Sequence, residues 1–318
     1  MRDGELPEPL EGDDSKDVWV KRFSWWWDEN PFCDEDSPIG YILRSSSGEI
    51  VGFSGFIPVD YELSGEVIPS LIATTMFVRE SHRSAVIGLI ARQRKLGREY
   101  HIVDGSPSPD MRRLLEKMGY EHAGKRFQSY FPLTGFGGLA TQTILEKAGL
   151  SIPLPSRREI SPTNYFATAP EEIETIPERG DDSLRKRITL ESMEWLSRVG
   201  SGERSFFGYC DAQGELIAYA IGFYKRKYGL CLCLLQDYYD FRPEENGIGQ
   251  LIRAILEDPI GCGVARDTDA LALSVFGVES APRPSGLRRR TILYYHVPEG
   301  IDPVSKTCLP IEGDLALI

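Results

Sequence analysis

The stretch Leu71–Val103, LIATTMFVRESHRSAVIGLIARQRKLGREYHIV, constrains the fold of this chain more than any other. Residues 71–78 are apolar or β-branched and contain no glycine or proline, as is typical of a buried strand. From Ser84 onward apolar residues recur at helical spacing, and Gly97 stands where a helix would end. Tyr100–Val103 predicts a second buried strand. A short helix between two strands implies a right-handed crossover onto a parallel strand pair.

The turn that joins the first of these strands to the helix carries the chemistry of the stretch. It reads Arg83-Ser84-Ala85-Val86-Ile87-Gly88. The start of a helix presents backbone N–H groups without intrahelical partners and the positive end of the helix dipole, and here an arginine stands beside them. The turn therefore predicts an anion site, most naturally a site for phosphate.

Length and composition are those of a soluble globular protein of about two domains, with 318 residues, 41% of them hydrophobic and 26% charged. The net charge of −12 argues against general nucleic-acid binding. Residues 1–17, MRDGELPEPLEGDDSKD, predict an acidic flexible tail without an apolar signal core. No apolar run is long enough for a membrane helix. We therefore expect a cytoplasmic protein without membrane association, either a monomer or a homodimer.

The cysteines and histidines show no metal-binding pattern. Cys231 and Cys233 alternate on an apolar strand, which predicts buried reduced thiols that share one face. The remaining residues of these two types are scattered without ligand spacing: Cys33, Cys210, Cys262, Cys308, His82, His101, His122 and His296. We expect no metal.

A first domain is expected over residues 18–150. Within it, Trp19–Asn30 (WVKRFSWWWDEN) predicts an aromatic-rich helix that ends before Pro31. Its three consecutive tryptophans, Trp25–Trp27, cannot all face one core, so at least one is expected to line a groove or an interface. The next segment predicts two hairpins, with strands at 40–44 and 49–58 and turns at 45–48 and near 64–65.

Beyond the central stretch the sequence predicts a second helix. Ser108 suits the N-cap, Pro109 the first helical position and Gly119 the end of the helix. A further strand is expected at 124–135. Residues 151–170, SIPLPSRREISPTNYFATAP, are rich in proline and polar residues and predict a linker or crossing segment.

The second domain, expected over 171–318, repeats the order of the first. Residues 206–241 again give a strand, a turn, a longer strand, a turn and a long apolar strand, and Asp211–Gly214 parallels the first turn of the first half. Residues 242–257 supply the turn and helix, and 269–278 the next buried strand. Because the whole order recurs, we interpret the chain as an internal duplication.

This order of elements resembles the GNAT superfamily of N-acetyltransferases, here in tandem. The most diagnostic motif of that family, Gln/Arg-x-x-Gly-x-Gly/Ala, joins the fourth strand to a helix and holds the CoA pyrophosphate with backbone amides. The first half matches it at Arg83 and Gly88 but has Val86 in place of the first glycine. The second half has Gly247 and Gly249 but begins with Glu244.

The family also tends to carry Asn-x-x-Ala-x-x-Leu-Tyr-x-x-x-Gly-Phe after the fifth strand. The segment that begins at Ser108 fits that spacing, with a serine in place of the asparagine. Leu115 replaces the tyrosine that often protonates the leaving thiolate, so a general acid is absent at that position. The resemblance covers residues 38–135 well and 203–280 more loosely.

The resemblance implies an α/β (α+β) protein of two tandem GNAT-like domains. Each domain would be a mixed, mostly antiparallel twisted sheet flanked by helices, with a central parallel β–α–β unit. The implied activity is an acyltransferase that takes acetyl-CoA or another acyl-CoA as its cosubstrate. It would transfer the acyl group directly, in a ternary complex, to a small amine, amino sugar or amino-acid-like acceptor.

For the cofactor, the first loop is favoured over the second. Arg83 adds a cation near the phosphates, whereas Glu244 and Glu245 add like charge. Backbone N–H groups of the fourth strand would face the thioester oxygen. The candidate cofactor residues are therefore Met76, Phe77, Val78, Arg83, Ser84, Ala85, Val86, Ile87, Gly88 and Ser108, with Asn246, Gly247, Ile248 and Gly249 as the alternative loop.

Asp104, just past the fifth strand, could accept the proton of the attacking amine, directly or through water. A turn or capping role is the alternative for this aspartate. Trp26 and Tyr61 in the first half are candidates for the acceptor pocket. Asp237 and Tyr239, at the end of a buried strand of the second half, are further candidates.

Two other function classes stay open. A transferase of this fold could take its acyl group from aminoacyl-tRNA, although the net charge argues against it and the basic cluster at 287–290 is short. A catalytically silent ligand-binding or scaffold protein is the other class, because both loops are imperfect and the tyrosine is missing.

Overall fold

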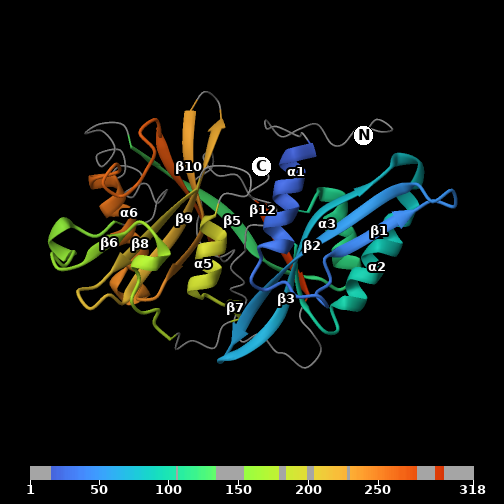
Figure 1. Cartoon of the computed structure of the whole chain (residues 1–318), viewed down its shortest axis with the longest axis horizontal. Helices are drawn as coiled ribbons and strands as arrows, with labels where there is room; N and C mark the ends of the chain where they lie inside the picture. The colour runs from blue at the N-terminus through green and yellow to red at the C-terminus, as the bar shows by residue number, and fades with distance from the viewer. Residues whose placement is uncertain are drawn as a thin grey trace. The chain divides into compact units, whose positions relative to one another are not determined.

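The computed structural model describes residues 16–104, 107–133, 154–178, 184–198, 204–227, 230–277 and 291–296. They form two compact units, whose elements Figure 1 labels. Unit 1 contains the described residues up to Lys125, those from 184 to Arg187, and β12 (Thr291–His296). Unit 2 contains those of 126–178 and 188–277. The chain passes from unit 1 to unit 2 within β5 (Glu121–Pro132).

Unit 1 is built on a mixed sheet with the strand order β1-β2-β3-β4-β12. Its other strands are β1 (Gly40–Arg44), β2 (Ile50–Leu63), β3 (Glu66–Val78) and β4 (His101–Asp104). Among the described strand pairs of this unit, only β3–β4 is parallel, as the crossover predicts. Both hairpin turns form where expected: Gly48, Ser64 and Gly65 have positive φ values of 83°, 51° and 80°.

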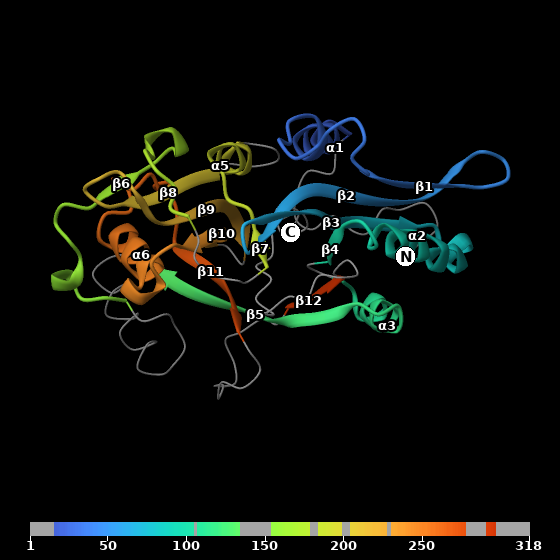
Figure 2. The ribbon, with the colours of Figure 1, turned by 90° about the horizontal axis from the view of Figure 1, so that it is seen from below.

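Helices cover both faces of this sheet. Figure 2 shows α1 (Lys16–Phe23) with η1 (Ser24–Asp28) over one face of β2 and β3, and α2 (Val86–Leu96) with α3 (Pro109–Lys117) on the other. The Ser108 hydroxyl caps α3 by accepting a hydrogen bond from the Met111 N–H at 3.3 Å, as predicted. The core beneath α2 and α3 consists of Phe56, Leu71, Ala73, Ile102, Leu115 and Tyr120.

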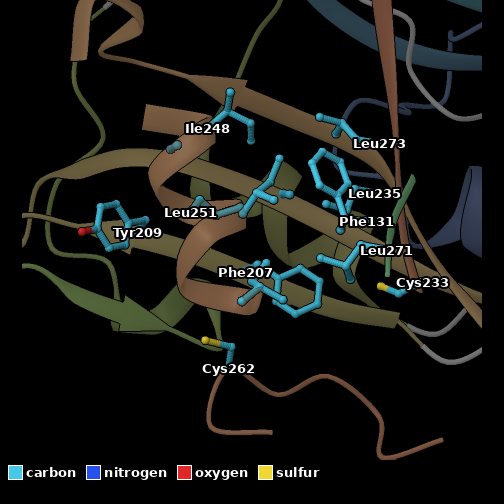
Figure 3. Close-up of a cluster of buried hydrophobic side chains, with 14 of the residues drawn as sticks. Phe131, Phe207, Tyr209, Cys233, Leu235, Ile248, Leu251, Cys262, Leu271 and Leu273 are labelled. Atoms are coloured by element: carbon cyan, nitrogen blue, oxygen red, sulfur yellow. The ribbon is translucent and has the colours of Figure 1, made fainter. Parts of the chain in front are cut away.

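Unit 2 has the strand order β11-β10-β9-β8-β6. These strands are β6 (Tyr165–Ala167), β8 (Arg204–Cys210), β9 (Leu216–Lys227), β10 (Leu230–Asp240) and β11 (Ala270–Gly277), and β10 and β11 are parallel. The helices are α5 (Leu190–Ser197) and α6 (Gly247–Glu257). Figure 3 shows the main core, in which Phe207, Leu235, Leu251 and Leu271 meet between α6 and the sheet.

The predicted mixed α/β fold is confirmed, and each unit contains a parallel β–α–β element. The two units do not have the same boundaries as the expected contiguous domains 18–150 and 171–318. Two strands from late in the chain belong to unit 1, because β12 pairs with β4 and β7 (Arg185–Lys186) pairs with β2. Residues 154–170, expected as part of a linker, contain η3 (Arg157–Glu159) and the edge strand β6, which pairs with β8.

Four cysteines, Cys210, Cys231, Cys233 and Cys262, are buried free thiols, and Cys33 is partly exposed. Among the described residues no helix combines the length and apolar character needed to cross a membrane. The acidic tail up to residue 15, the basic cluster at 287–290 and Cys308 lie outside the described residues.

Candidate active site

In unit 1, β3 and β4 run side by side for only four residues. Ser70 to Ala73 pair with His101 to Asp104, and β4 ends there. β3 continues to Val78, and its other edge stays paired with β2. Among the described residues, no strand pairs with the β4 side of β3 beyond Ala73. The edge of β3 from Thr74 to Val78 therefore has no described strand beside it on the β4 side, and we call this stretch the open edge of β3.

A β-bulge marks the point where the edge opens. Thr74 pairs with Gly55 and Met76 with Ser54, so Thr75 has no partner on β2. The φ of Thr75 is +34°, a conformation that β-branched residues rarely adopt. The bulge was not predicted from the sequence, and it fixes which backbone groups face the open edge.

The backbone donors on this edge follow from the hydrogen bonds to β2. The Arg79 N–H donates to the Val51 carbonyl oxygen at 2.8 Å. Because N–H groups alternate between the two edges of a strand, the Phe77 N–H also points towards β2. The N–H groups of Met76 and Val78 point to the open edge. Of the three backbone N–H groups expected to face the thioester, those of Met76 and Val78 remain. The Phe77 N–H is directed at β2 within the sheet.

The loop before α2 leaves the start of that helix open. It forms the short 3-10 helix η2 (Glu80–Ala85), and Ala85 stands at the N-cap of α2 without a side-chain hydrogen bond. A Cβ added at Gly88 would meet no atom within 4 Å, and Ile87 is 61% exposed. The first turn of α2 is therefore accessible from solvent.

The charges around this loop are balanced rather than strongly positive. Arg83 lies 3.7 Å from Glu80, and both side chains are about half exposed. Arg79, which sequence reasoning missed, lies 2.5 Å from Glu49. Its position directly after the last residue of β3 could have marked Arg79 in the sequence as a cation near the loop. An anion at this helix start would compete with two glutamates for the two arginines.

The polar residues beyond β4 have separate roles. Asp104 is half-buried at the end of β4, opposite Ala73 of β3. The Ser108 hydroxyl is used by the helix cap described above, so its assignment to the cofactor is weakened. Leu115 is fully buried in the core, which leaves no acid at that position. Tyr120 lies in the same core, where burial and the charge of Asp104 raise the pKa of its phenol.

The acceptor candidates of unit 1 do not line an open groove. Trp26 and Tyr61 are fully buried, and the Tyr61 ring meets the His101 ring edge-on at 4.9 Å. Trp27 stacks on Phe23 at 4.8 Å, and its indole N–H donates to the Phe56 carbonyl oxygen at 2.8 Å. Trp25 and Trp26 are buried and Trp27 is partly buried, so the expectation that at least one of the three lines a groove or an interface stays a prediction.

Unit 2 repeats the opening and the bulge, here at Gln236, but its polar groups are used internally. The Tyr219 hydroxyl donates to Asp237 Oδ2 at 3.0 Å, and both side chains are buried. Tyr239 is also buried and packs edge-on against Phe241 at 4.7 Å. These two acceptor candidates therefore lie inside the unit rather than on its surface.

The loop of unit 2 that holds both glycines is filled by its own side chains. Asp240 Oδ2 accepts a hydrogen bond from the Ile248 N–H at 2.9 Å, at the start of α6, and Oδ1 accepts one from the Arg242 N–H at 3.0 Å. The alternative cofactor loop, Asn246 to Gly249, thus begins a helix whose terminus already holds a carboxylate.

Comparison with known proteins gives likenesses of structure only. No protein-family profile matches the chain, and no curated protein matches it. Solved structures similar to it include a GCN5-related N-acetyltransferase from Anabaena variabilis, with 13% identity, a TM-score of 0.49, and coverage of 80% of this chain and 61% of that one. Another from Kribbella flavida has 13% identity, a TM-score of 0.45 and coverage of 79% and 58%.

Saccharomyces cerevisiae N-myristoyltransferase with bound myristoyl-CoA is also similar, with 13% identity, a TM-score of 0.44, and coverage of 89% of this chain and 76% of that one. The chain spans about three fifths of the length of the two acetyltransferases. Each unit of this chain has the order of elements that the sequence predicts, with antiparallel strands followed by a parallel strand pair and a loop that leads into a helix.

Proposed function

We propose that the chain is an acyl-CoA-dependent acyltransferase that takes its cosubstrate in unit 1. The observation that carries the proposal is the open edge of β3, where the Met76 and Val78 N–H groups face away from β2. Backbone donors fixed in a sheet suit a developing oxyanion, since they need no reorganisation during the reaction. The uncapped start of α2 supports phosphate binding at the end of the same strand.

The proposed reaction is direct attack of an amine on the thioester. The Met76 or Val78 N–H would polarise the carbonyl group, and Asp104 would take the amine proton directly or through water. The coenzyme thiolate would then leave without a general acid at Leu115. The acceptor is proposed to be a small amine, amino sugar or amino-acid-like molecule, and the two units to be tandem GNAT-like domains.

A second candidate function is a silent protein that binds CoA without transfer. Two features favour it: Val86 replaces the glycine that would let backbone approach the pyrophosphate, and Leu115 replaces the family's acid. Binding and turnover must therefore be measured separately.

Thermal unfolding with CoA, acetyl-CoA and longer acyl-CoAs tests binding. A ligand at about one hundred times its Kd adds roughly 2.7 kcal/mol of stability, which is an increase in Tm of about 5–11 °C at about 2–4 °C per kcal/mol. Arg83→Glu should abolish the increase, whereas Arg44→Glu, a charge reversal at the last residue of β1, should leave it intact. No increase with any CoA species at millimolar concentration would rule the proposal out.

Release of free thiol with a panel of amines then separates the two functions. An acyltransferase releases CoA only when a suitable amine is present. A protein stabilised by CoA that releases no thiol from acyl-CoA with any amine, and that transfers no aminoacyl group from aminoacyl-tRNA, would be the silent binder.

A further inference from the structure

The start of α6 in unit 2 holds an anion that belongs to the chain itself. The Asp240 carboxylate lies at the last position of β10 and accepts a hydrogen bond from the Ile248 N–H in the first turn of the helix. Its second oxygen receives the Arg242 N–H. A carboxylate that accepts backbone N–H groups at a helix start meets the same donors and the same dipole that a phosphate would use.

The two glycines of this loop are explained by the chain's own side chains. A Cβ at Gly247 would lie 2.5 Å from Asp240 Oδ1 and 2.9 Å from a methyl carbon of Ile217, so only glycine lets the carboxylate approach. A Cβ at Gly249 would lie 2.5 Å from Asn246 Oδ1. Asn246 itself has a φ of +55° and begins the helix in the left-handed conformation. The Gly-x-Gly pattern therefore accommodates internal packing and does not require a ligand.

The charges at the start of α6 disfavour a phosphate there, as the lack of space does. The pKa of Asp240 is raised overall: burial raises it most, the N–H groups of Ile248 and Arg242 lower it, and the charges of Glu244 and Glu245 raise it further. A phosphate at this helix start would thus meet a resident carboxylate and two further acidic side chains. In unit 1, α2 follows η2 directly: the Val86 N–H donates to the Arg83 carbonyl oxygen, and a Cβ at Gly88 would meet no atom within 4 Å.

We propose that Asp240 is the resident anion of unit 2, which closes the α6 terminus to phosphate-bearing ligands and leaves unit 1 as the only unit that takes the cosubstrate. The second clause rests on the proposed function; the first stands on the Asp240 contacts. The loop of unit 2 then resembles an anion-binding loop, but the anion at its helix start is the Asp240 carboxylate from the end of β10.

Thermal unfolding of the full chain with inorganic pyrophosphate as the probe tests the first clause. All proteins carry Arg83→Glu, so that the loop of unit 1 does not contribute. Asp240→Ala should lower Tm by about 2–8 °C, as the loss of a helix cap does, and millimolar pyrophosphate should restore at least half of the loss. The parent should show less than 1 °C of response, by the order of magnitude expected without a site.

Asp258→Ala is the matched control. Asp258 is the acidic residue at the other end of α6, where its carboxylate accepts the Gly261 N–H at 2.9 Å. Its removal should lower Tm without any recovery in pyrophosphate, because the carboxyl end of a helix does not attract anions. If Asp240→Ala does not fold, Asp240→Ser removes the charge and shortens the side chain while keeping one accepting oxygen, and the same recovery is expected from a smaller loss.

Three results would overturn the inference. The first is an unchanged Tm in Asp240→Ala, and the second is a parent that gains as much from pyrophosphate as the variant does. The third is a calorimetric titration of the wild-type chain that finds two acyl-CoA molecules bound. A chain that binds no acyl-CoA but shows the pyrophosphate recovery would refute the proposed function and keep Asp240 as the resident anion.

Discussion

Replacement of Arg242 by glutamine should be among the most destabilising polar substitutions in unit 2. Its guanidinium Nη2 lies 2.6 Å from Asp211 Oδ2 and 2.7 Å from Glu215 Oε1. The Arg242 side chain is 24% exposed and that of Asp211 15%, whereas that of Glu215 is 39% exposed, so the cluster is partly removed from water. The arginine joins the β8–β9 turn to the segment that leads into α6.

The magnitude follows from the degree of burial. An exposed ion pair contributes about 0–1 kcal/mol, whereas removal of one partner of a buried pair costs about 3–5 kcal/mol. Arg242 lies between these limits and leaves two carboxylates uncompensated, so Arg242→Gln should cost about 2–3 kcal/mol. At about 2–4 °C per kcal/mol, Tm should fall by roughly 4–12 °C.

Thermal and urea unfolding measure this loss, with Arg198→Gln as the control. Arg198 pairs with Glu194 at 3.5 Å along an exposed helix face, and its loss should cost less than about 0.5 kcal/mol. An Arg242→Gln variant within about 0.5 kcal/mol of that control would refute the argument from burial.

The same cluster predicts a pH dependence. Burial alone would raise the pKa of Asp211, but the hydrogen bond from Arg242 and the N–H groups of Glu215 and Gln213 outweigh it and lower the pKa. A lowered folded pKa gives stability that is present above the unfolded value of about 3.9 and is lost as the pH falls through the folded value. The difference between wild type and Arg242→Gln should therefore shrink below about pH 4. A constant difference down to pH 2 would contradict this sign.

Three further substitutions test the packing and the backbone. Gly222→Ala should cost about 1–3 kcal/mol, because its Cβ would lie 2.5 Å from Cys233 Sγ and 2.7 Å from the Phe207 ring; equal urea midpoints would contradict this. Thr75→Gly relieves about 1–2 kcal/mol of positive-φ strain and adds about 0.5–1 kcal/mol of chain entropy, so it should be neutral to slightly stabilising; a clear loss of stability would show that the bulge is unstrained. Ser108→Ala should cost about 1 kcal/mol of stability and Ser108→Gly only a few tenths, and neither should change the Kd for acyl-CoA. Weaker acyl-CoA binding in both variants would show that the Ser108 hydroxyl contacts the cofactor.

The parts of the fold that the sequence predicts are those with local causes. The turn at 45–48, the cap at Ser108 and the helix end at Gly97 each depend on one residue and its immediate neighbours. The pairing of β7 with β2 and of β12 with β4 joins segments more than one hundred residues apart. No local pattern encodes such pairing, so it could not enter the contiguous domains 18–150 and 171–318, which were expected from the recurring order of elements.

Burial decided the outcome for the four acceptor candidates, which are Trp26, Tyr61, Asp237 and Tyr239. A tyrosine or tryptophan serves a core and a pocket equally well, and Trp26 and Tyr61 are excluded from an open pocket only by their surroundings. The Thr75 bulge is likewise invisible in an unbroken apolar strand. It nevertheless decides that Met76, and not Phe77, presents its N–H to the open edge.

The two helix starts show why a glycine pattern alone does not identify an anion site. The loop with both glycines is the one that is filled, and the loop with a valine in place of the first glycine is the one that is open. What distinguishes them is a carboxylate seven residues before Gly247, at the end of the preceding strand, where it reaches the first turn of α6. An acidic residue at that position is the signal that sequence reasoning could have used. The electrostatics of a phosphate loop therefore depend on what the strand delivers to the helix as much as on the loop itself.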